Sequence, residues 1–510
     1  MKTNNSSQKE GPELIIALVG ALGSNLEKLT SELTNALQVV GYSSQLIKVS
    51  SLLHEIPKYN SLPSHPVASH IKEHQKAGNN FCSELEDGAA LSALSIAAIR
   101  NEREKVNSNP DLPLIRTAYI IRSLKRPEEA SFLRDIYGKS FYLISGYSPR
   151  NLRVDDLASK IASSQNSMDN NAQRHIAEEL INIDEKEKGN DFGQNVSDAF
   201  PLADAFFDLS NHVELNKSVT RFIEIVFGHP FHTPSRDEYV MFHSKAAALR
   251  SSDISRQVGA AISTDDGDVI AVGCNEVPKG GGGLYWAGDI PDGRDFHDSK
   301  DISSEMKRNT FGDVISRLKK NGRFTKDLQG KSDEALLDTL LKDMDGAQIM
   351  SLGEYGRTVH AEMAALLDAA RRGTSIHGLN LFTTTFPCHN CAKHIVATGI
   401  KRVVYIEPYP KSLAKTLHGD SIAIEDCADN GNKIIFEPFV GIAPKRYISL
   451  FSKTKRKDIN GNPIVWDRAA AIPRYLESDA HLAYRQKETN IVKTLRLKLD
   501  KIMTEKEGGG

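Results

Sequence analysis

Three residues carry the nitrogen and sulfur atoms that zinc prefers as ligands: His360, Cys388 and Cys391. Structural zinc sites are closed by a fourth protein ligand, whereas catalytic sites keep three protein ligands and one open position. We therefore predict that these residues bind Zn2+ at a catalytic site. His389 and His394 are near enough in the sequence to complete a structural site. A structural zinc knuckle or a redox-active Cys-x-x-Cys pair is therefore the alternative.

Glu362 stands two residues after His360, so its carboxylate can reach a molecule on the metal without being a ligand. Zinc lowers the pKa of a bound water, and a carboxylate beside it can act as a general acid and base. Glu362 is therefore the predicted catalytic residue. A structural knuckle explains neither Glu362 nor the presence of Pro387 directly before Cys388.

Two helices and a strand must position these residues. Residues 359–371 are rich in Ala and Leu and contain no Pro or Gly, which predicts a helix. Residues 379–385 are rich in β-forming residues and predict a strand. Residues 388–398 then predict a second helix. A Cys-x-x-Cys sequence at a helix N-terminus brings both sulfurs near one point and favours the thiolate.

A second candidate site lies near the N-terminus. The apolar run 14–19 predicts a buried strand, and leucines at helical spacing predict a helix after it. The turn between them contains Gly20, Gly23 and Ser24. A strand, a glycine-rich turn and a helix can hold a phosphate group on the helix N-terminus. These three residues are therefore candidates for nucleotide binding, and a purely structural turn is the alternative.

This turn departs from the Walker A motif. After its four-residue spacer the motif requires Gly, Lys and Ser or Thr. The corresponding positions hold Asn25, Leu26 and Glu27. The phosphate-binding lysine is missing and Glu27 has the wrong charge, so we interpret the segment as a degenerate P-loop. This argues against a phosphotransferase.

Strand-like and helix-like segments alternate up to about residue 230, which predicts a parallel sheet covered on both faces. A segment with two prolines and a glycine, residues 228–235, marks a boundary. The predicted fold class is α/β, with a P-loop NTPase-like domain before a second α/β domain. The predicted division of the chain is a disordered segment 1–12, the first domain 13–230, the second domain 237–455 with an insertion at 279–350, and a helical extension 456–510.

The composition excludes several classes of protein. The net charge is −2 over 510 residues, so no overall field attracts the chain to nucleic acid or to a membrane. The sequence contains no run of 18 apolar residues, so neither a membrane span nor a signal peptide is expected. Zinc accounts for two of the five cysteines, and the other three are scattered, which is typical of a cytoplasmic protein without disulfides.

Five short motifs carry a resemblance to a known family. They are Lys245–Ser251, Arg256–Ala260, Gly273–Pro278, His360–Glu362 and Pro387–Cys391. Over roughly residues 237–440 the chain resembles a deoxycytidylate deaminase of the cytidine deaminase-like superfamily. The resemblance implies a three-layer α/β/α fold, a Zn2+ cofactor, and hydrolytic deamination of dCMP, dCTP or both to dUMP and dUTP.

With the degenerate P-loop domain included, the chain resembles bacterial anti-phage deoxycytidylate deaminases of the AvcD type. That resemblance implies that the enzyme drains the cytosine nucleotide pool during infection. It also implies control by a regulatory nucleotide or an inhibitory RNA, and we expect a homo-oligomer. The alternatives are a housekeeping dCMP deaminase of pyrimidine salvage, a deaminase acting on single-stranded nucleic acid, and a sensor that binds nucleotide without catalysis.

Several substrate contacts follow from the resemblance together with side-chain chemistry. Asn275 would bind the sugar hydroxyl, and the backbone N–H of Ala361 would meet the ring O2. Arg256 is a candidate phosphate ligand because a guanidinium matches phosphate in a fork. Tyr409 and Lys411 are candidates for base stacking or phosphate contact. The alternatives are a turn residue for Asn275 and a surface cation for Arg256. The long insertion between Asn275 and His360 departs from short deaminases.

Overall fold

The strand β1 lies inside the first of two six-stranded sheets and is buried along its whole length, as its apolar sequence predicts. This computed structural model describes residues 11–166, 170–297, 302–344, 347, 355–409, 411–425, 433–452, 455–474 and 480–507. The strands of this sheet are β1 (Leu14–Val19), β2 (Ser43–Lys48), β3 (Thr117–Leu124), β4 (Phe141–Tyr147), β5 (Ala205–Asp208) and β12 (Gly441–Ile442).

The strand order is β12-β5-β4-β1-β3-β2. The pairs β1–β3, β1–β4, β2–β3 and β4–β5 are parallel, and among the described strands of this sheet only β12 pairs in the antiparallel direction. The predicted parallel sheet is therefore confirmed. Its predicted likeness to P-loop NTPases remains a prediction.

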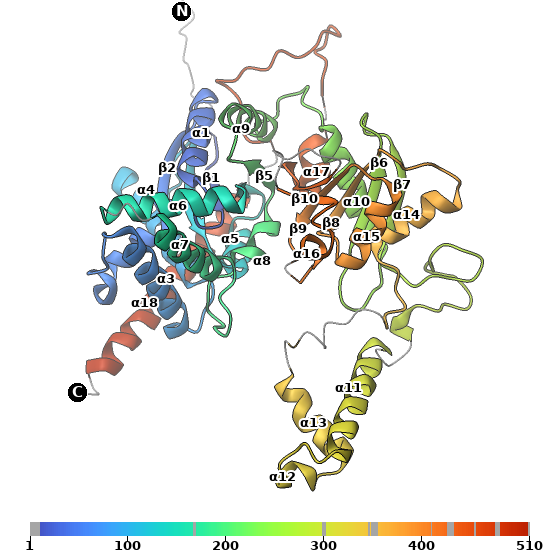
Figure 1. Cartoon of the computed structure of the whole chain (residues 1–510). Coiled ribbons are helices and arrows are strands. Elements are labelled where there is room, and N and C mark those ends of the chain that lie inside the picture. Colours follow the sequence, from blue (N-terminus) through green and yellow to red (C-terminus); the bar gives the residue numbers. More distant parts are fainter. Residues whose placement is uncertain are drawn as a thin grey trace, which may run out of the picture. The chain divides into compact units, whose positions relative to one another are not determined.

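Helices flank this sheet (Figure 1). Alternate residues of β1, Leu14, Ile16 and Leu18, share one buried cluster with the apolar faces of α1 and α9. The helices of this part of the chain are α1 (Leu26–Val39), α2 (Val49–Leu52), α3 (Val67–Glu84), α4 (Ala90–Asn107), α5 (Pro127–Tyr137), α6 (Arg150–Ser164), α7 (Asn170–Glu185), α8 (Val196–Ala199), α9 (His212–Val226), α10 (Arg236–Ala248), α17 (Pro444–Phe451) and α18 (Ala480–Glu507).

The second sheet has the order β10-β11-β9-β8-β6-β7. Strands β6 and β7 are consecutive and pair antiparallel as a hairpin. Helix α14 packs on both of these strands. The elements are β6 (Gly259–Ser263), β7 (Val269–Cys274), α11 (Ile302–Lys320), α12 (Lys326–Gln329), α13 (Asp333–Asp343), α14 (Ala361–Arg371), β8 (Asn380–Thr385), α15 (His389–Thr398), β9 (Arg402–Glu407), α16 (Ala414–His418), β10 (Ile422–Ile424) and β11 (Ile434–Pro438).

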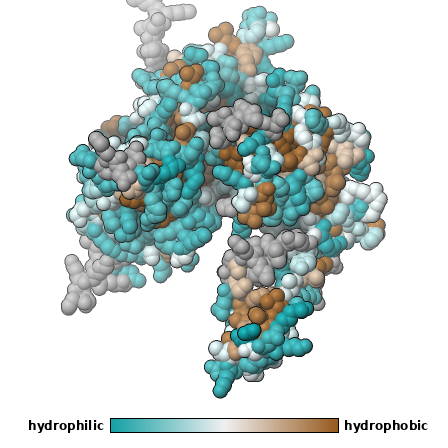
Figure 2. All heavy atoms as spheres, viewed as in Figure 1, coloured by the Kyte–Doolittle hydropathy of each residue, from teal (hydrophilic) through white to brown (hydrophobic). Residues whose placement is uncertain are grey.

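The described part of the predicted insertion contains a helical pair with a small core of its own. Phe311 and Ile315 of α11 are buried against Leu336 of α13. Figure 2 shows hydrophobic side chains gathered where these helices lie. None of the described helices combines the length and the apolar character that a membrane span requires.

The chain divides differently from the predicted boundaries at 230, 455 and 456. One compact unit contains residues 1–242, 406–408 and 438–510, and the other contains 243–405 and 409–437. The segment after residue 437 returns to the first unit because β12 extends its sheet and the backbone N–H of Ile442 donates to Glu238. Of the predicted disordered segment 1–12, residues 1–10 lie outside the described residues. Gly11 is buried, and its carbonyl accepts a hydrogen bond from the Arg116 N–H.

Within the first unit, a buried ion cluster joins helix α18 to the N-terminal part of the chain. The guanidinium of Arg103 on α4 is fully buried and donates to both Glu13 and Glu488, with its nearest Glu488 oxygen 2.6 Å away. Tyr137 donates to Glu488, and Tyr484 donates to Glu13. The predicted C-terminal helix therefore has a partner, which its irregular apolar spacing did not reveal.

We expect Arg103→Met to destabilise the first unit, because it removes the buried cation that Glu13 and Glu488 share and leaves only Arg100, 3.9 Å from Glu488. Breaking a buried ion pair costs about 3–5 kcal/mol. Urea unfolding of the full chain measures the loss. Lys105→Met, an exposed change on the same helix, is the matched control. A loss for Arg103→Met no larger than that of the control would contradict a structural role for the cluster.

Candidate functional site

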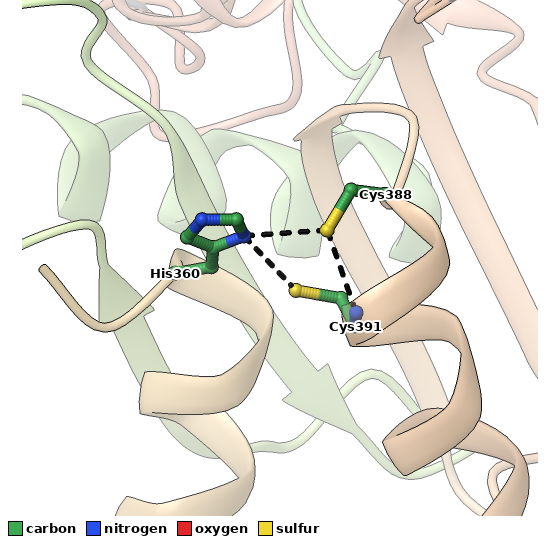
Figure 3. A group of neighbouring side chains, drawn as sticks. All are labelled: His360, Cys388 and Cys391. Carbon is green, nitrogen blue, oxygen red and sulfur yellow. Dashed lines mark hydrogen bonds between the residues drawn. The ribbon is translucent and has the colours of Figure 1, made fainter. Parts of the chain in front are cut away.

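The structure brings the three predicted ligands together at the start of two helices (Figure 3). His360 is the N-cap of α14, and Cys388 is the N-cap of α15. Nδ1 of His360 lies 3.4 Å from Sγ of Cys388 and 3.4 Å from Sγ of Cys391. Helix α14 begins two residues later than predicted and α15 one residue later, so His360 and Cys388 precede the helices rather than lying within them.

This donor set fits a zinc ion. Ligands at the usual zinc distances, in tetrahedral geometry, place nitrogen and sulfur about 3.6 Å apart. The observed separations of 3.4 Å agree with this value. His389 and His394 do not join the group, whose ligand atoms lie within 4.8 Å of one another. The described residues thus supply three ligands, which suits a catalytic site better than a closed structural one.

The ionisation of the three ligands is coupled. The hydrogen bond with Cys391 lowers the pKa of the Cys388 thiol to about 3. The same contact raises the pKa of Cys391. The hydrogen bond with Cys388 raises the pKa of His360 to about 9. A metal that binds here must therefore displace protons from His360 and Cys391.

Glu362 lies beside the ligands but outside their group. It belongs to the first turn of α14, is only 5% exposed, and has its Oε2 3.5 Å from Sγ of Cys391. Burial raises the pKa of its carboxyl group to about 6. A buried carboxyl group in this position can exchange protons with a molecule held at the centre.

A close approach between β7 and α14 places His360. At Gly273 an added Cβ would lie 2.3 Å from the carbonyl oxygen of Ala361 and 2.4 Å from the amide nitrogen of Ala365. The two ends of the segment between Asn275 and His360 are also held together, because Glu276 and Val359 exchange both backbone hydrogen bonds. The long insertion therefore leaves from and returns to one point.

Glu276 fixes a loop beside the centre and was not among the predicted site residues. Its buried carboxylate accepts hydrogen bonds from the backbone N–H and the hydroxyl of Ser252. The same loop contains Asp253, whose charge contributes to the raised pKa of His360. The sequence signal for Glu276 was its place in the Gly273–Pro278 motif, but the sequence did not show that its carboxylate contacts Ser252.

Of the predicted substrate residues, Arg256 lies on this loop and Asn275 lies beside it, directly after β7. The Asn275 side chain is a backbone clamp: it accepts from the Val258 N–H at 2.7 Å and donates to the Arg256 carbonyl at 2.6 Å. Arg256 is exposed. The clamp agrees with the turn alternative for Asn275, and a sugar contact by its second amide hydrogen remains a prediction.

Ala361 follows His360 directly, whereas Tyr409 and Lys411 lie on a turn that is linked to the residue before Cys388. Ala361 is the first residue of α14, where a backbone N–H has no partner within the helix. Tyr409 accepts a hydrogen bond from the Ser412 N–H, and the Ser412 hydroxyl donates to the carbonyl of Pro387, next to Cys388. Lys411 is exposed on that turn. Their roles remain predictions.

The predicted turn with Gly20, Gly23 and Ser24 belongs to the first unit and connects β1 to α1. Gly23 has φ +87° and packs against Arg153, whose carbonyl oxygen would lie 2.6 Å from an added Cβ. The Ser24 hydroxyl oxygen is buried and has no described hydrogen-bond partner. Nucleotide binding by these three residues stays a prediction.

Charged side chains surround this turn. The Leu22 N–H donates to the Asp184 carboxylate at 2.7 Å. Lys125 pairs with the same carboxylate at 2.7 Å and donates to the Gly20 carbonyl at 3.3 Å. Glu27 pairs with Arg122 at 3.2 Å. A phosphate group on the Leu22 amide would have to replace Asp184.

The chain is similar to known deaminases over its middle part. Residues 234–407 match the family described as cytidine and deoxycytidylate deaminase zinc-binding region. The deoxycytidylate deaminase of Enterobacteria phage T2 is 50% identical over 54 residues, which are 11% of this chain and 29% of that protein. The probable deoxycytidylate deaminase of Drosophila melanogaster is 28% identical over 172 residues, 33% of this chain and 58% of that protein.

A solved structure also aligns with the chain. The dCMP deaminase of the cyanophage S-TIM5, in complex with dCMP and dUMP, is 18% identical, with a TM-score of 0.23 over 41% of this chain and 100% of that one. The chain spans less than two thirds of the length of the two curated relatives. The family match supports the predicted resemblance for residues 237–407 and a zinc-binding region there.

We expect Gly273→Ala to weaken the metal centre, because the new methyl group pushes α14 away from β7. Overpacking of this kind costs about 1–3 kcal/mol. Thermal unfolding and zinc content of the purified full chain measure the effect. Gly280→Ala, where an added Cβ meets nothing within 4 Å, is the control. If both variants keep the wild-type stability and zinc content, the close approach does not position His360.

Proposed function

We propose that this chain is a zinc-dependent hydrolase that deaminates a free deoxycytidine nucleotide, dCMP or dCTP, to dUMP or dUTP. The observation that carries the proposal is the buried carboxyl group of Glu362 beside a three-ligand His/Cys/Cys centre. A structural zinc site has no use for such a group. The similarity of residues 234–407 to deoxycytidylate deaminases supports the choice of substrate.

Glu362 is the proposed proton carrier. Zinc held by His360, Cys388 and Cys391 supplies a water molecule of lowered pKa. The Glu362 carboxylate would take one proton from the attacking water and pass it to N3 of the base as the water oxygen bonds to C4. It would then take the second proton from the new C4 hydroxyl group and pass it to the amino group, which leaves as ammonia while the C4 carbonyl forms. The backbone N–H of Ala361, at the start of α14, is placed to donate to the ring O2.

Two nearby segments are proposed to hold the rest of the nucleotide. Asn275 fixes the loop that carries Arg256, and its second amide hydrogen would meet the sugar hydroxyl. The exposed guanidinium of Arg256 is suited to the phosphate. Tyr409 and Lys411 lie on the turn that Ser412 ties to Pro387, where they would contact the base or the phosphate.

A deaminase acting on single-stranded nucleic acid is the second candidate. Such an enzyme needs a basic groove with interleaved aromatic side chains, and the net charge of −2 disfavours it. Mass spectrometry after incubation with dCMP, dCTP and a cytosine-containing oligonucleotide separates the candidates. The same panel with added dTTP or dCTP tests for regulatory nucleotides.

We further propose a defence role, in which a cytoplasmic homo-oligomer drains the deoxycytidine nucleotide pool of a phage-infected cell. The first unit would then control the deaminase by binding a nucleotide or an inhibitory RNA. The support is the resemblance to AvcD-type deaminases together with the glycine turn at Gly20–Ser24. Survival and nucleotide pools of infected cells expressing the wild type or Glu362→Gln test this role against housekeeping salvage.

We expect Glu362→Gln to reduce deamination by about 100-fold to 10,000-fold, because it removes the proton carrier. The zinc content should stay that of the wild type, since Glu362 is not a ligand. The same change at an exposed carboxylate, Glu305→Gln, should alter neither quantity. Near-normal turnover, or loss of zinc together with activity, would show that Glu362 has another role.

We expect Ser24→Glu to change the response of the full chain to regulatory nucleotides, because it adds negative charge where a phosphate group would sit. The basal deamination rate and its change on adding dTTP or dCTP are measured together. Ser31→Glu, on the exposed side of α1, is the control. If Ser24→Glu matches the wild type in both rates and in phage protection, the turn is only a scaffold.

A further inference from the structure

Three histidines gather in the first unit, outside the site described above. His70 and His74 stand one helical turn apart on α3, and His54 belongs to the short 3-10 helix Leu53–Glu55. The ring centroids are 4.1 Å apart for His70 and His74 and 5.1 Å apart for His54 and His74. Histidines at i and i+4 on a helix present their rings on one face.

The backbone determines which nitrogen of each ring carries hydrogen. Nδ1 of His74 lies 2.7 Å from the carbonyl oxygen of His70, and Nδ1 of His70 lies 2.8 Å from that of Pro63. A carbonyl oxygen only accepts, so both Nδ1 atoms must donate. In the neutral rings the lone pairs are therefore on Nε2. Nδ1 of His54 also faces a carbonyl oxygen, that of Asn60, at the longer distance of 3.5 Å.

His54 and His74 then direct two Nε2 atoms at each other. These atoms are 3.0 Å apart. If all three Nδ1 atoms donate to their carbonyl groups, both of these Nε2 atoms are acceptors, and two acceptors repel at this distance. An electrophile between them, either a proton or a metal ion, removes the conflict.

The distance between the two nitrogens is close to that of two imidazoles on one metal ion. Two imidazole nitrogens bound tetrahedrally to zinc lie about 3.3 Å apart. The separation of 3.0 Å is shorter by a margin similar to that at the His360 centre. Histidine ligands of metals commonly donate their other N–H to a backbone carbonyl, which fixes the ring and the tautomer. His74 shows that arrangement.

We propose that His54 and His74 form a second metal site, which binds a late first-row divalent cation such as Zn2+ through two Nε2 atoms, with water completing the coordination. His70 orients His74 through its backbone carbonyl and is not assigned as a ligand. The described His, Cys, Asp and Glu ligand atoms include no further group of three within 4.8 Å besides the His360 centre. The protein ligands of the proposed site are therefore the two imidazoles of His54 and His74 alone.

The surroundings favour imidazole-seeking metals over Mg2+ or Ca2+. Both proposed ligand atoms are imidazole nitrogens. Hard cations require oxygen ligands, whereas zinc and its neighbours accept imidazole. A bound ion would join the Leu53–Glu55 segment to α3 and so stabilise this part of the first unit.

The test titrates the purified full chain with Zn2+ at pH 7.5 and counts bound zinc after gel filtration. We expect two zinc ions per wild-type chain, and one in His54→Gln and in His74→Gln. The exposed His175→Gln, in the same unit, should keep two. Deamination should be unchanged in His54→Gln, because His54 belongs to no part of the proposed active site.

Co2+ provides a second readout that does not depend on activity. The first equivalent should produce sulfur-to-cobalt charge-transfer absorption from Cys388 and Cys391, and the second equivalent should not increase it. Circular dichroism checks that each variant is folded. One zinc ion in the wild type would show that a proton joins His54 to His74. Two zinc ions in both variants would show that the second ion binds elsewhere. Either result overturns the proposal.

Discussion

The zinc centre depends on one steric constraint: the N-termini of α14 and α15 must meet at a single point. Helix α14 can approach β7 this closely because residue 273 is a glycine, since a side chain at that position would collide with the helix backbone. The backbone pairing of Glu276 with Val359 then holds the residue before His360, wherever the intervening insertion lies. The positions of the ligands therefore do not depend on the length of the insertion, which can vary while the ligands stay in place.

The parts of the site that could be predicted from sequence are those set by local spacing. His360, Glu362 and the Cys-x-x-Cys pair each belong to one helix start, so their residue types indicated the chemistry directly. The substrate contact of Asn275 stays a prediction, and the hydrogen bonds that its side chain makes to the backbone of Val258 and Arg256 were not predicted. The Ser252–Glu276 contact was missed because a buried carboxylate has no sequence periodicity.

Long-range pairing explains why the division of the chain was harder to predict. The strand alternation correctly indicated a parallel sheet, and the apolar run at 14–19 is its fully buried strand β1. Nothing local shows that Gly441–Ile442 adds an edge to that sheet, since two residues carry no pattern. The partner of α18 was equally hidden, because polar and charged residues rather than an apolar stripe make the contact.

The contact between Arg103 and Glu488 also bears on the order in which parts of the chain can fold during synthesis. The two residues are 385 positions apart, and a ribosome adding 5–20 residues per second needs roughly 20–80 s to cover that distance. During that interval all of residues 243–437, with every zinc ligand, leaves the ribosome before the first unit can close its core. A chain released after residue 437 but before residue 488 would therefore carry all three metal ligands, while the buried guanidinium of Arg103 would have Glu13 but not Glu488 as a partner. The first unit can therefore complete its buried ion cluster only after residues 243–437 have been synthesised.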